Sequence, residues 1–230
     1  MEETISLIDS TIQSNQDITL TDVNAGKIIQ IQEDSELKHC VIHSDIIQAD
    51  GQAVIWASKI LGKPLKERVA GIDLVEKLVK LAYDKNYKIF FFGAQEDVVQ
   101  KVIKNYISTY NENIVAGYRN GYFKMEDSAH IAQDIANSGA HILFVAITSP
   151  LQEQFLYYNR DILKSVSFKM GVGGSFDVFA GKTKRAPLWM QKIGMEWFYR
   201  FLQEPKRMWK RYLVGNTKFL FLVLKEKFRK

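Results

Sequence analysis

The amino-acid sequence predicts an α/β protein with a mostly parallel sheet, helices on both faces of the sheet and a basic helical appendage at its C-terminal end. Short apolar runs bounded by turn residues recur along the chain and are separated by helical patterns, which is typical of strands that alternate with helices. The charge then changes sharply. Residues 182–230 hold 14 lysines and arginines against three glutamates, whereas residues 1–181 hold 17 basic and 23 acidic residues. An acidic body with a strongly basic end indicates an anionic partner, either a nucleic acid or a membrane surface.

Six strands are expected, at residues 18–23, 39–43, 88–92, 113–118, 141–147 and 166–170. Most of these runs are rich in Ile, Val, Phe or Tyr, which favour strands. The segments between them have helical patterns, and crossover helices on both faces are typical of a parallel sheet. We expect an α/β core over residues 1–193 and a membrane-associating appendage over residues 194–230, near the composition change at Gly181.

Composition narrows the class of protein. The longest unbroken apolar stretches, residues 142–147 and 219–224, are far shorter than the roughly 18 residues that indicate a membrane-spanning helix. The acidic start, MEETISLIDS, lacks the basic flank and apolar centre of a signal peptide, which predicts a cytoplasmic protein. The single cysteine, Cys40, excludes an internal disulfide and a cysteine-based zinc site, and we expect it to be a buried strand residue.

The tail predicts an amphipathic helix from Pro205, which suits a first helical turn, to Gly215, which suits a helix stop. At about 100° per residue, basic residues occupy one side and mainly aromatic and apolar residues the other: Lys206, Arg207, Lys210 and Arg211 against Met208, Trp209, Tyr212 and Leu213. This helix either packs its aromatic side on its own core or lies in a membrane interface with its basic side on lipid phosphates. Residues 219–230 repeat the pattern.

Three predicted strands end in residues that favour a turn or a helix start, as in phosphate-binding sites. Gly93 follows the first, Ser149 is a candidate N-cap before Pro150 at the second, and the turn Gly171-Val172-Gly173-Gly174-Ser175 follows the third. Ligands of parallel sheets bind beyond the carboxyl ends of the strands, where helix N-termini offer N–H groups to phosphate. None of these turns is specific alone, and neither the GxGxxG nor the Walker A spacing is present. Together they indicate a nucleotide that carries a diphosphate.

Asp50 is the candidate for acid–base chemistry, because it lies between an apolar run and an apolar helix, with Gly51 beside it. It is either a general base at a strand-to-helix edge or an ordinary helix cap. No cluster of His and carboxylates resembles a metal site, and neither an Asp-x-Asp motif nor a GxSxG elbow occurs. The four histidines are interpreted as strand or surface residues: His39, His43, His130 and His141.

Several segments occur in order and with compatible spacing over residues 20–216. They are Ala49-Asp50-Gly51, Glu67-Arg68-Val69-Ala70-Gly71-Ile72-Asp73-Leu74, Gly121-Tyr122-Phe123, Ser149-Pro150-x-Gln152-Glu153, Gly171-Val172-Gly173-Gly174-Ser175-Phe176-Asp177, Ala180-Gly181-Lys182, Arg185-Ala186-Pro187 and Gln203-Glu204-Pro205-Lys206-Arg207. As a set they resemble the WecG/TagA/CpsF family of bacterial glycosyltransferases, glycosyltransferase family 26.

The resemblance implies a Rossmann-like, inverting and metal-independent enzyme that uses no cofactor. It would move a hexose, N-acetylmannosamine or a related sugar, from a UDP-sugar donor to a polyprenyl-diphosphate-linked sugar, typically N-acetylglucosamine. Such a transfer serves the assembly of a cell-surface polysaccharide or wall teichoic acid. The lipid of the acceptor implies a peripheral protein at the cytoplasmic face of the membrane, with the basic tail on the anionic surface.

The resemblance also implies roles for single residues. Asp50 falls on the family's general base. The substrate-binding residues are Asp22, where a threonine is common, together with Asn24, Arg68, Ser149, Gln152, Gly173, Gly174 and Arg207. Helix N-termini near Ser149 and Gly174, with Arg68 or a basic residue of the tail, would hold the departing diphosphate in place of a metal.

Two alternatives come from other classes of protein. A nicotinamide or methyl-donor enzyme is compatible with the predicted sheet, but its glycine fingerprint is missing. A nucleic-acid-binding module would use the basic tail, but no nucleic-acid motif accompanies the charge, so no nucleic-acid partner is expected. The sequence leaves open whether the tail closes over the site of its own subunit or over that of a neighbour in a homo-oligomer.

Overall fold

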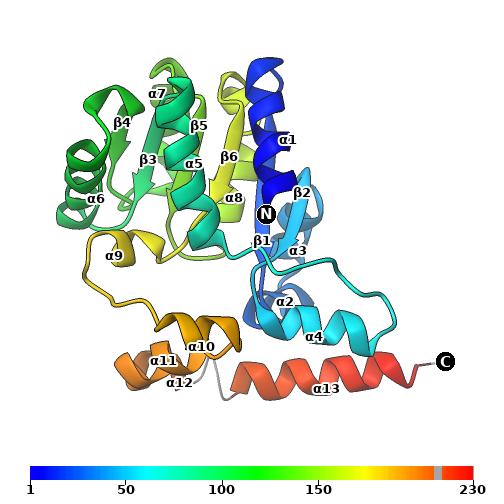
Figure 1. Ribbon diagram of the computed structural model, residues 1–230. Helices are drawn as coiled ribbons and strands as arrows, with labels where there is room; N and C mark the ends of the chain where they lie inside the picture. Colours follow the sequence, from blue (N-terminus) through cyan, green and yellow to red (C-terminus); the bar gives the residue numbers. More distant parts are fainter. Residues whose placement is uncertain (210–213, 230) are drawn as a thin grey trace. The chain divides into compact units, whose positions relative to one another are not determined.

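The computed structural model describes residues 1–209 and 214–229, and the chain in it forms two compact units (Figure 1). Unit 1 consists of Met1–Thr21, Cys40–Ile47 and Gly71–Thr183, and unit 2 consists of Asp22–His39, Gln48–Ala70 and Lys184–Lys230. The boundary after Thr183 lies close to the composition change near Gly181. Unit 2 contains the expected appendage of residues 194–230 together with segments from the first third of the chain. That residues 194–230 act as a separate appendage stays a prediction.

The strands form one six-stranded sheet in the order β2-β1-β6-β5-β3-β4. Their bounds are β1 (Ile18–Val23), β2 (Ile46–Ala49), β3 (Ile89–Gly93), β4 (Val115–Arg119), β5 (Ile142–Ala146) and β6 (Phe168–Gly171). The pairs β1–β6, β6–β5, β5–β3 and β3–β4 are parallel, with a register shift between Ile89 and Phe90 where β3 meets β4. The predicted α/β class with a parallel, Rossmann-like sheet is confirmed.

One predicted strand is wrong. Residues 39–42 form the end of helix α3 (Ser35–Ile42) and His43 follows in a turn, and the strand in this part of the chain is β2. The helix forms because its buried residues, Leu37, Cys40 and Val41, recur at helical spacing, and because Asp34 accepts a hydrogen bond from the N–H of Leu37 at 2.9 Å. Cys40 is therefore buried, as predicted, but on a helix.

Helices of unit 1 cover both faces of its strands. They are α1 (Glu2–Gln13), α5 (Gly71–Lys85), α6 (Glu96–Thr109), α7 (Ser128–Asn137), α8 (Leu151–Tyr158) and α9 (Ser175–Phe179), with the 3-10 turns η1 (Glu112–Ile114), η2 (Met125–Asp127) and η3 (Ile162–Ser165). Successive side chains of a strand point to opposite faces. Phe90 and Phe92 join a cluster with residues of α7 and α8, whereas the ring of Phe91 lies against Tyr106 of α6 and Phe176 of α9. This alternation confirms the predicted helices on both faces (Figure 1).

Unit 2 has a small apolar core of its own. Its helices are α2 (Ala25–Glu33), α4 (Gln52–Ile60), α10 (Leu188–Lys192), α11 (Glu196–Gln203), α12 (Pro205–Trp209) and α13 (Gly215–Lys227). Phe219 and Val223 of α13 pack with Ala25 at the start of α2 and with Val54 and Ile55 of α4. An ion pair of 2.6 Å from Lys218 to Glu33 joins α13 to α2 at the surface. The end of the chain is thus built into unit 2 (Figure 1).

The predicted tail helix is confirmed at its start and wrong at its end. Helix α12 begins at Pro205, but Gly215, the predicted helix stop, is the first residue of α13. Packing of Phe219 and Val223 in the core of unit 2 outweighs the low helix propensity of glycine. Lys210, Arg211, Tyr212 and Leu213 lie outside the described residues, so the two-sided pattern over residues 205–215 stays a prediction. No helix in residues 1–209 and 214–229 is long and apolar enough to cross a membrane.

Candidate functional site

Asp50 occupies the loop between β2 and α4, and the main chain of this loop is fixed from both sides. The N–H of Asp50 donates to the carbonyl oxygen of Val23 at 3.0 Å, and the carbonyl oxygen of Ala49 accepts from the N–H of Val69 at 3.0 Å. Gly51 is the N-cap of α4, so the interpretation of Asp50 as the helix cap is wrong. The Asp50 side chain is half-buried at the end of the strand, a position from which a carboxylate can meet a bound substrate.

Arg68 fastens the Asp50 loop to the chain that leads into the tail. Its Nε donates to the carbonyl oxygen of Asp50 at 2.6 Å, and its Nη1 donates to the carbonyl oxygen of Gln191 at 3.5 Å. Its Nη2 pairs with Oε2 of Glu196 at 3.0 Å, with both side chains at most one-fifth exposed. The structure therefore brings Asp50 and Arg68 together and ties both to Glu196, and the predicted role of Arg68 in substrate binding stays a prediction.

Glu196 also pairs with a second arginine, Arg185. Sequence reasoning identified neither Glu196 nor Arg185 as a site residue. The Oε1 of Glu196 accepts from Nε of Arg185 at 3.4 Å. Arg185 belongs to the Arg-Ala-Pro segment that supported the resemblance, so the sequence carried a signal for it. Glu196 had a weaker one, as one of three acidic residues in the basic tail. One carboxylate between two guanidinium groups thus joins α11 to Arg185 and to Arg68, which contacts the Asp50 loop.

Two further predicted residues of unit 2, Asp22 and Asn24, lie at the end of β1. Asn24 is the N-cap of α2, and its Oδ1 accepts from the N–H of Lys27 at 3.1 Å. A Cβ atom placed on Gly51 would lie 3.1 Å from the Cβ of Asn24, so the Asp50 loop and the start of α2 approach closely. Asp22 is half-buried on β1, two residues before Asn24. The structure thus groups Asn24 with the Asp50 loop.

In unit 1, Gln152 shapes the glycine-rich turn after β6. The Gln152 side chain is buried, and its Oε1 accepts from the N–H of Gly173 at 3.2 Å while its Nε2 donates to Oε1 of Glu153 at 2.7 Å. Any Cβ on Gly171 would lie 2.7 Å from the Gln152 side chain, and Gly173 has a φ of 49°. Both positions therefore favour glycine. The structure therefore brings Gln152 and this turn together, whereas substrate binding by Gln152 stays a prediction.

Ser149 and Gly174 lie near the starts of α8 and α9, the two helices of the predicted phosphate site. Gly174 is the N-cap of α9. The prediction of Ser149 as an N-cap is wrong, because α8 starts one residue later, with Pro150 as its N-cap and Leu151 as its first residue. The Oγ of Ser149 is buried and has no hydrogen-bond partner within the described residues. Arg207 belongs to α12, but its side chain lies outside what the structure describes.

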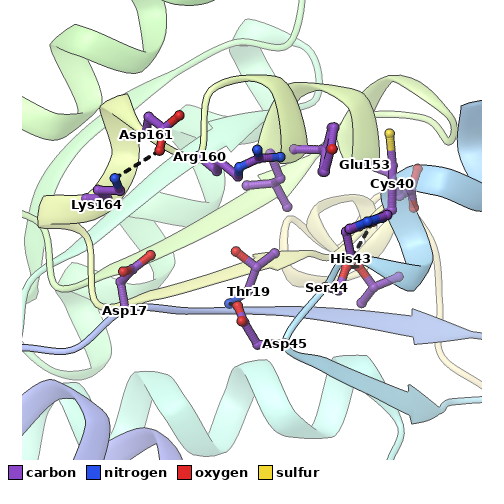
Figure 2. A pocket seen from close by; sticks show the side chains of 13 residues that line it. Asp17, Thr19, Cys40, His43, Ser44, Asp45, Glu153, Arg160, Asp161 and Lys164 are labelled. Atoms are coloured by element: carbon purple, nitrogen blue, oxygen red, sulfur yellow. Dashed lines mark hydrogen bonds and ion pairs between the residues drawn. The ribbon is translucent and has the colours of Figure 1, made fainter.

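A polar cavity of about 210 Å³ in unit 1 contains none of the predicted site residues (Figure 2). Asp17 and Asp45, which line it, immediately precede β1 and β2. Asp45 accepts from the N–H of Thr19 at 2.7 Å, and Asp17 pairs with the buried Lys169. Burial lowers the pKa of Lys169, against the opposing effect of Asp17. The cavity lies at the amino ends of these strands, whereas ligands of open parallel sheets bind beyond the carboxyl ends, so we do not assign it to the reaction.

Within residues 1–209 and 214–229, no group of three or more His, Cys, Asp or Glu side chains could hold a metal ion. Metal-independent chemistry stays a prediction from the resemblance.

A family model described as glycosyl transferase WecG/TagA/CpsF family matches residues 1–230. The chain belongs to this family. It is therefore a sugar transferase, as predicted. The family match favours this class of enzyme over the nicotinamide and methyl-donor alternatives. Two relatives carry the name N-acetylglucosaminyldiphosphoundecaprenol N-acetyl-beta-D-mannosaminyltransferase. The protein of Bacillus subtilis strain 168 is 40% identical over 184 residues, which cover 80% of this chain and 70% of the relative. That of Bacillus spizizenii strain W23 is 34% identical over 233 residues, 96% of this chain and 89% of the relative.

Proposed function

We propose that this glycosyltransferase moves N-acetylmannosamine, or a closely related hexose, from UDP to a polyprenyl-diphosphate-linked N-acetylglucosamine. The names of both relatives describe the transfer of N-acetylmannosamine to N-acetylglucosaminyldiphosphoundecaprenol. The observation that carries the proposal is the placement of Asp50, half-buried at a strand end on a loop that main-chain hydrogen bonds and Arg68 hold in place. A general base needs this combination of access to substrate and fixed position.

In the proposed reaction, the Asp50 carboxylate accepts the proton of an acceptor hydroxyl. The hydroxyl oxygen attacks the anomeric carbon of the donor from the face opposite UDP, and the bond from that carbon to the phosphate oxygen breaks. UDP leaves with the electron pair, the configuration at the anomeric carbon is inverted and the proton remains on Asp50. Arg68 contributes by fixing the main chain that carries Asp50.

The diphosphate of the donor is expected at the glycine-rich turn and the start of α8. A Cβ atom on Gly173 or Gly174 would meet nothing within 4 Å, so the main chain is open to a ligand there. N–H groups at a helix start attract anions, and the buried Oγ of Ser149, which has no hydrogen-bond partner in residues 1–209 and 214–229, is a further donor. These groups are proposed to stabilise the departing charge, and a role for Arg207 stays a prediction from the resemblance.

The tail is proposed to attach the protein to the cytoplasmic face of the membrane through α13. Phe219 and Val223 of this helix are buried in the core of unit 2. A different face exposes four apolar side chains that fall within about 100° of helix rotation: Leu220, Phe221, Leu224 and Phe228. Exposed lysines at 225 and 227 flank this face. An exposed apolar face with basic residues beside it is typical of helices that lie in the interface of an anionic membrane, where a lipid-linked acceptor is found.

The proposal is tested by Asp50→Asn, assayed with UDP-N-acetylmannosamine and a polyprenyl-diphosphate-linked N-acetylglucosamine analogue. An amide keeps the shape of the side chain but cannot take the proton, so we expect turnover to fall about 10² to 10⁴-fold, with UDP affinity by calorimetry near that of wild type. Asp97→Asn, on the exposed start of α6, is the matched control. Turnover of Asp50→Asn above about a third of wild type would assign the base to another residue.

A further inference from the structure

The strand that leads to Asp50 carries a buried polar side chain, that of Gln48, whose amide has no hydrogen-bond partner in residues 1–209 and 214–229. Gln48 lies on β2, two residues before Asp50, and is 8% exposed. Neither its Nε2 nor its Oε1 has a hydrogen-bond partner in the part of the chain that the structure describes. Buried polar groups are almost always paired, and leaving an amide unpaired away from water destabilises the folded state. A ligand that pairs with this amide would remove the cost.

The direction of the strand places Gln48 on the same side as Asp50. Ala49, between them, packs in the core of unit 2 with Ala25 and Val54. Successive side chains of a strand point to opposite faces, so Gln48 leaves the strand away from this core. The hydrogen bond from the N–H of Asp50 to Val23 continues the pairing of the strand past Ala49, and the alternation therefore extends to Asp50. Two residues of strand span about 6.6 Å, so a sugar ring held at the base lies within reach of the amide.

We propose that the Gln48 amide binds the transferred sugar of the UDP-sugar donor and contributes to the choice of that sugar. This inference rests on the proposed function. An amide offers two N–H donors and a carbonyl acceptor, which match the hydroxyl and N-acetyl groups of an N-acetylhexosamine. A site built to hydrogen-bond such groups rejects analogues that lack them, because its own buried polar atoms then stay unpaired.

The test compares Gln48→Met with wild type. Methionine keeps the approximate volume and removes the amide, so the free energy of unfolding in urea should be unchanged or higher. The value of kcat/KM for UDP-N-acetylmannosamine should fall at least about tenfold, the change typical of one lost polar contact. The affinity for UDP, which lacks the sugar, should stay within threefold by calorimetry. Gln48→Asn, with a shorter amide, is the second variant and should lose part of the same kcat/KM. Gln30→Met, on the exposed surface of α2, is the matched control and should change none of these quantities.

The outcomes separate this inference from the proposed function. If wild type transfers sugar and Gln48→Met keeps its donor kcat/KM, the Gln48 assignment fails and the proposed function stands. Lower stability of Gln48→Met, an equal loss of UDP affinity, or a change confined to the KM of the acceptor would also overturn the assignment. A wild-type protein that transfers no sugar from UDP-N-acetylmannosamine or from a related UDP-hexose would instead contradict the function itself.

Discussion

The exposed face of α13 gives the sharpest test of membrane attachment. We consider the double substitution Phe221→Ser and Phe228→Ser. Both side chains are largely exposed, at 68% and 77%, whereas Phe219 and Val223, which hold the helix in unit 2, are buried and left unchanged. The variant should therefore keep its fold, which circular dichroism and a urea titration can check, while losing apolar surface that only an external partner can cover.

The size of the effect follows from the exposed fractions. Full burial of a phenylalanine contributes about 1.5–3 kcal/mol, so moving the exposed parts of these two rings out of water contributes roughly 2–4 kcal/mol. An interfacial helix buries its apolar face only into the boundary of headgroups and acyl chains, which favours the lower value. A loss of about 2 kcal/mol corresponds to a decrease of about 30-fold in the partition coefficient.

The assay is co-sedimentation with vesicles that contain phosphatidylglycerol, at low and at physiological salt. Tyr122→Ser is the matched control, because this aromatic residue of unit 1 is 69% exposed and should not contribute to binding. Lysines near an anionic surface add an electrostatic contribution that weakens as salt rises, so the loss caused by the two serines should be clearest at physiological salt. A partition coefficient within threefold of wild type would refute the assignment of α13 to the membrane.

Two further predictions concern the site. Glu196→Ala should lower the free energy of unfolding by about 1–3 kcal/mol, because it leaves two largely buried guanidinium groups without their shared carboxylate. The same substitution should also reduce turnover, because the Asp50 loop is held less firmly. Glu196→Gln should have values of stability and turnover between those of Glu196→Ala and wild type. If Glu196→Ala equals wild type in both stability and turnover, the network is dispensable. Transfer should survive excess EDTA, since the family resemblance implies electrostatic stabilisation without a metal, and complete loss that Mg²⁺ or Mn²⁺ restores would overturn this expectation.

Most of the fold could be predicted because its signals are local. Runs such as Ile89–Gly93 and Ile142–Ala146 are apolar throughout and end at turn residues, which is the pattern of strands buried on both faces. The segment around Cys40 misled the prediction because a short apolar run is compatible with either a strand or a buried helix turn. Asp34, which caps that helix, is the local signal that could have separated the two.

Residues of the candidate site could be predicted only where their place in the sequence, such as the end of a strand, indicates a chemical role. Asp50 stood out because it lies at the junction of a strand and a helix beside glycine. Gln48 gave no such signal, since its importance depends on burial without a partner, which is a property of the folded chain. The contact of Arg68 with Glu196 joins residues 128 positions apart, and no periodicity or spacing encodes such a pair. Tertiary packing therefore shows which residues hold the Asp50 loop. The basic tail, which stood out in the sequence for its charge, contacts Arg68 of this network through Glu196, one of its few acidic side chains.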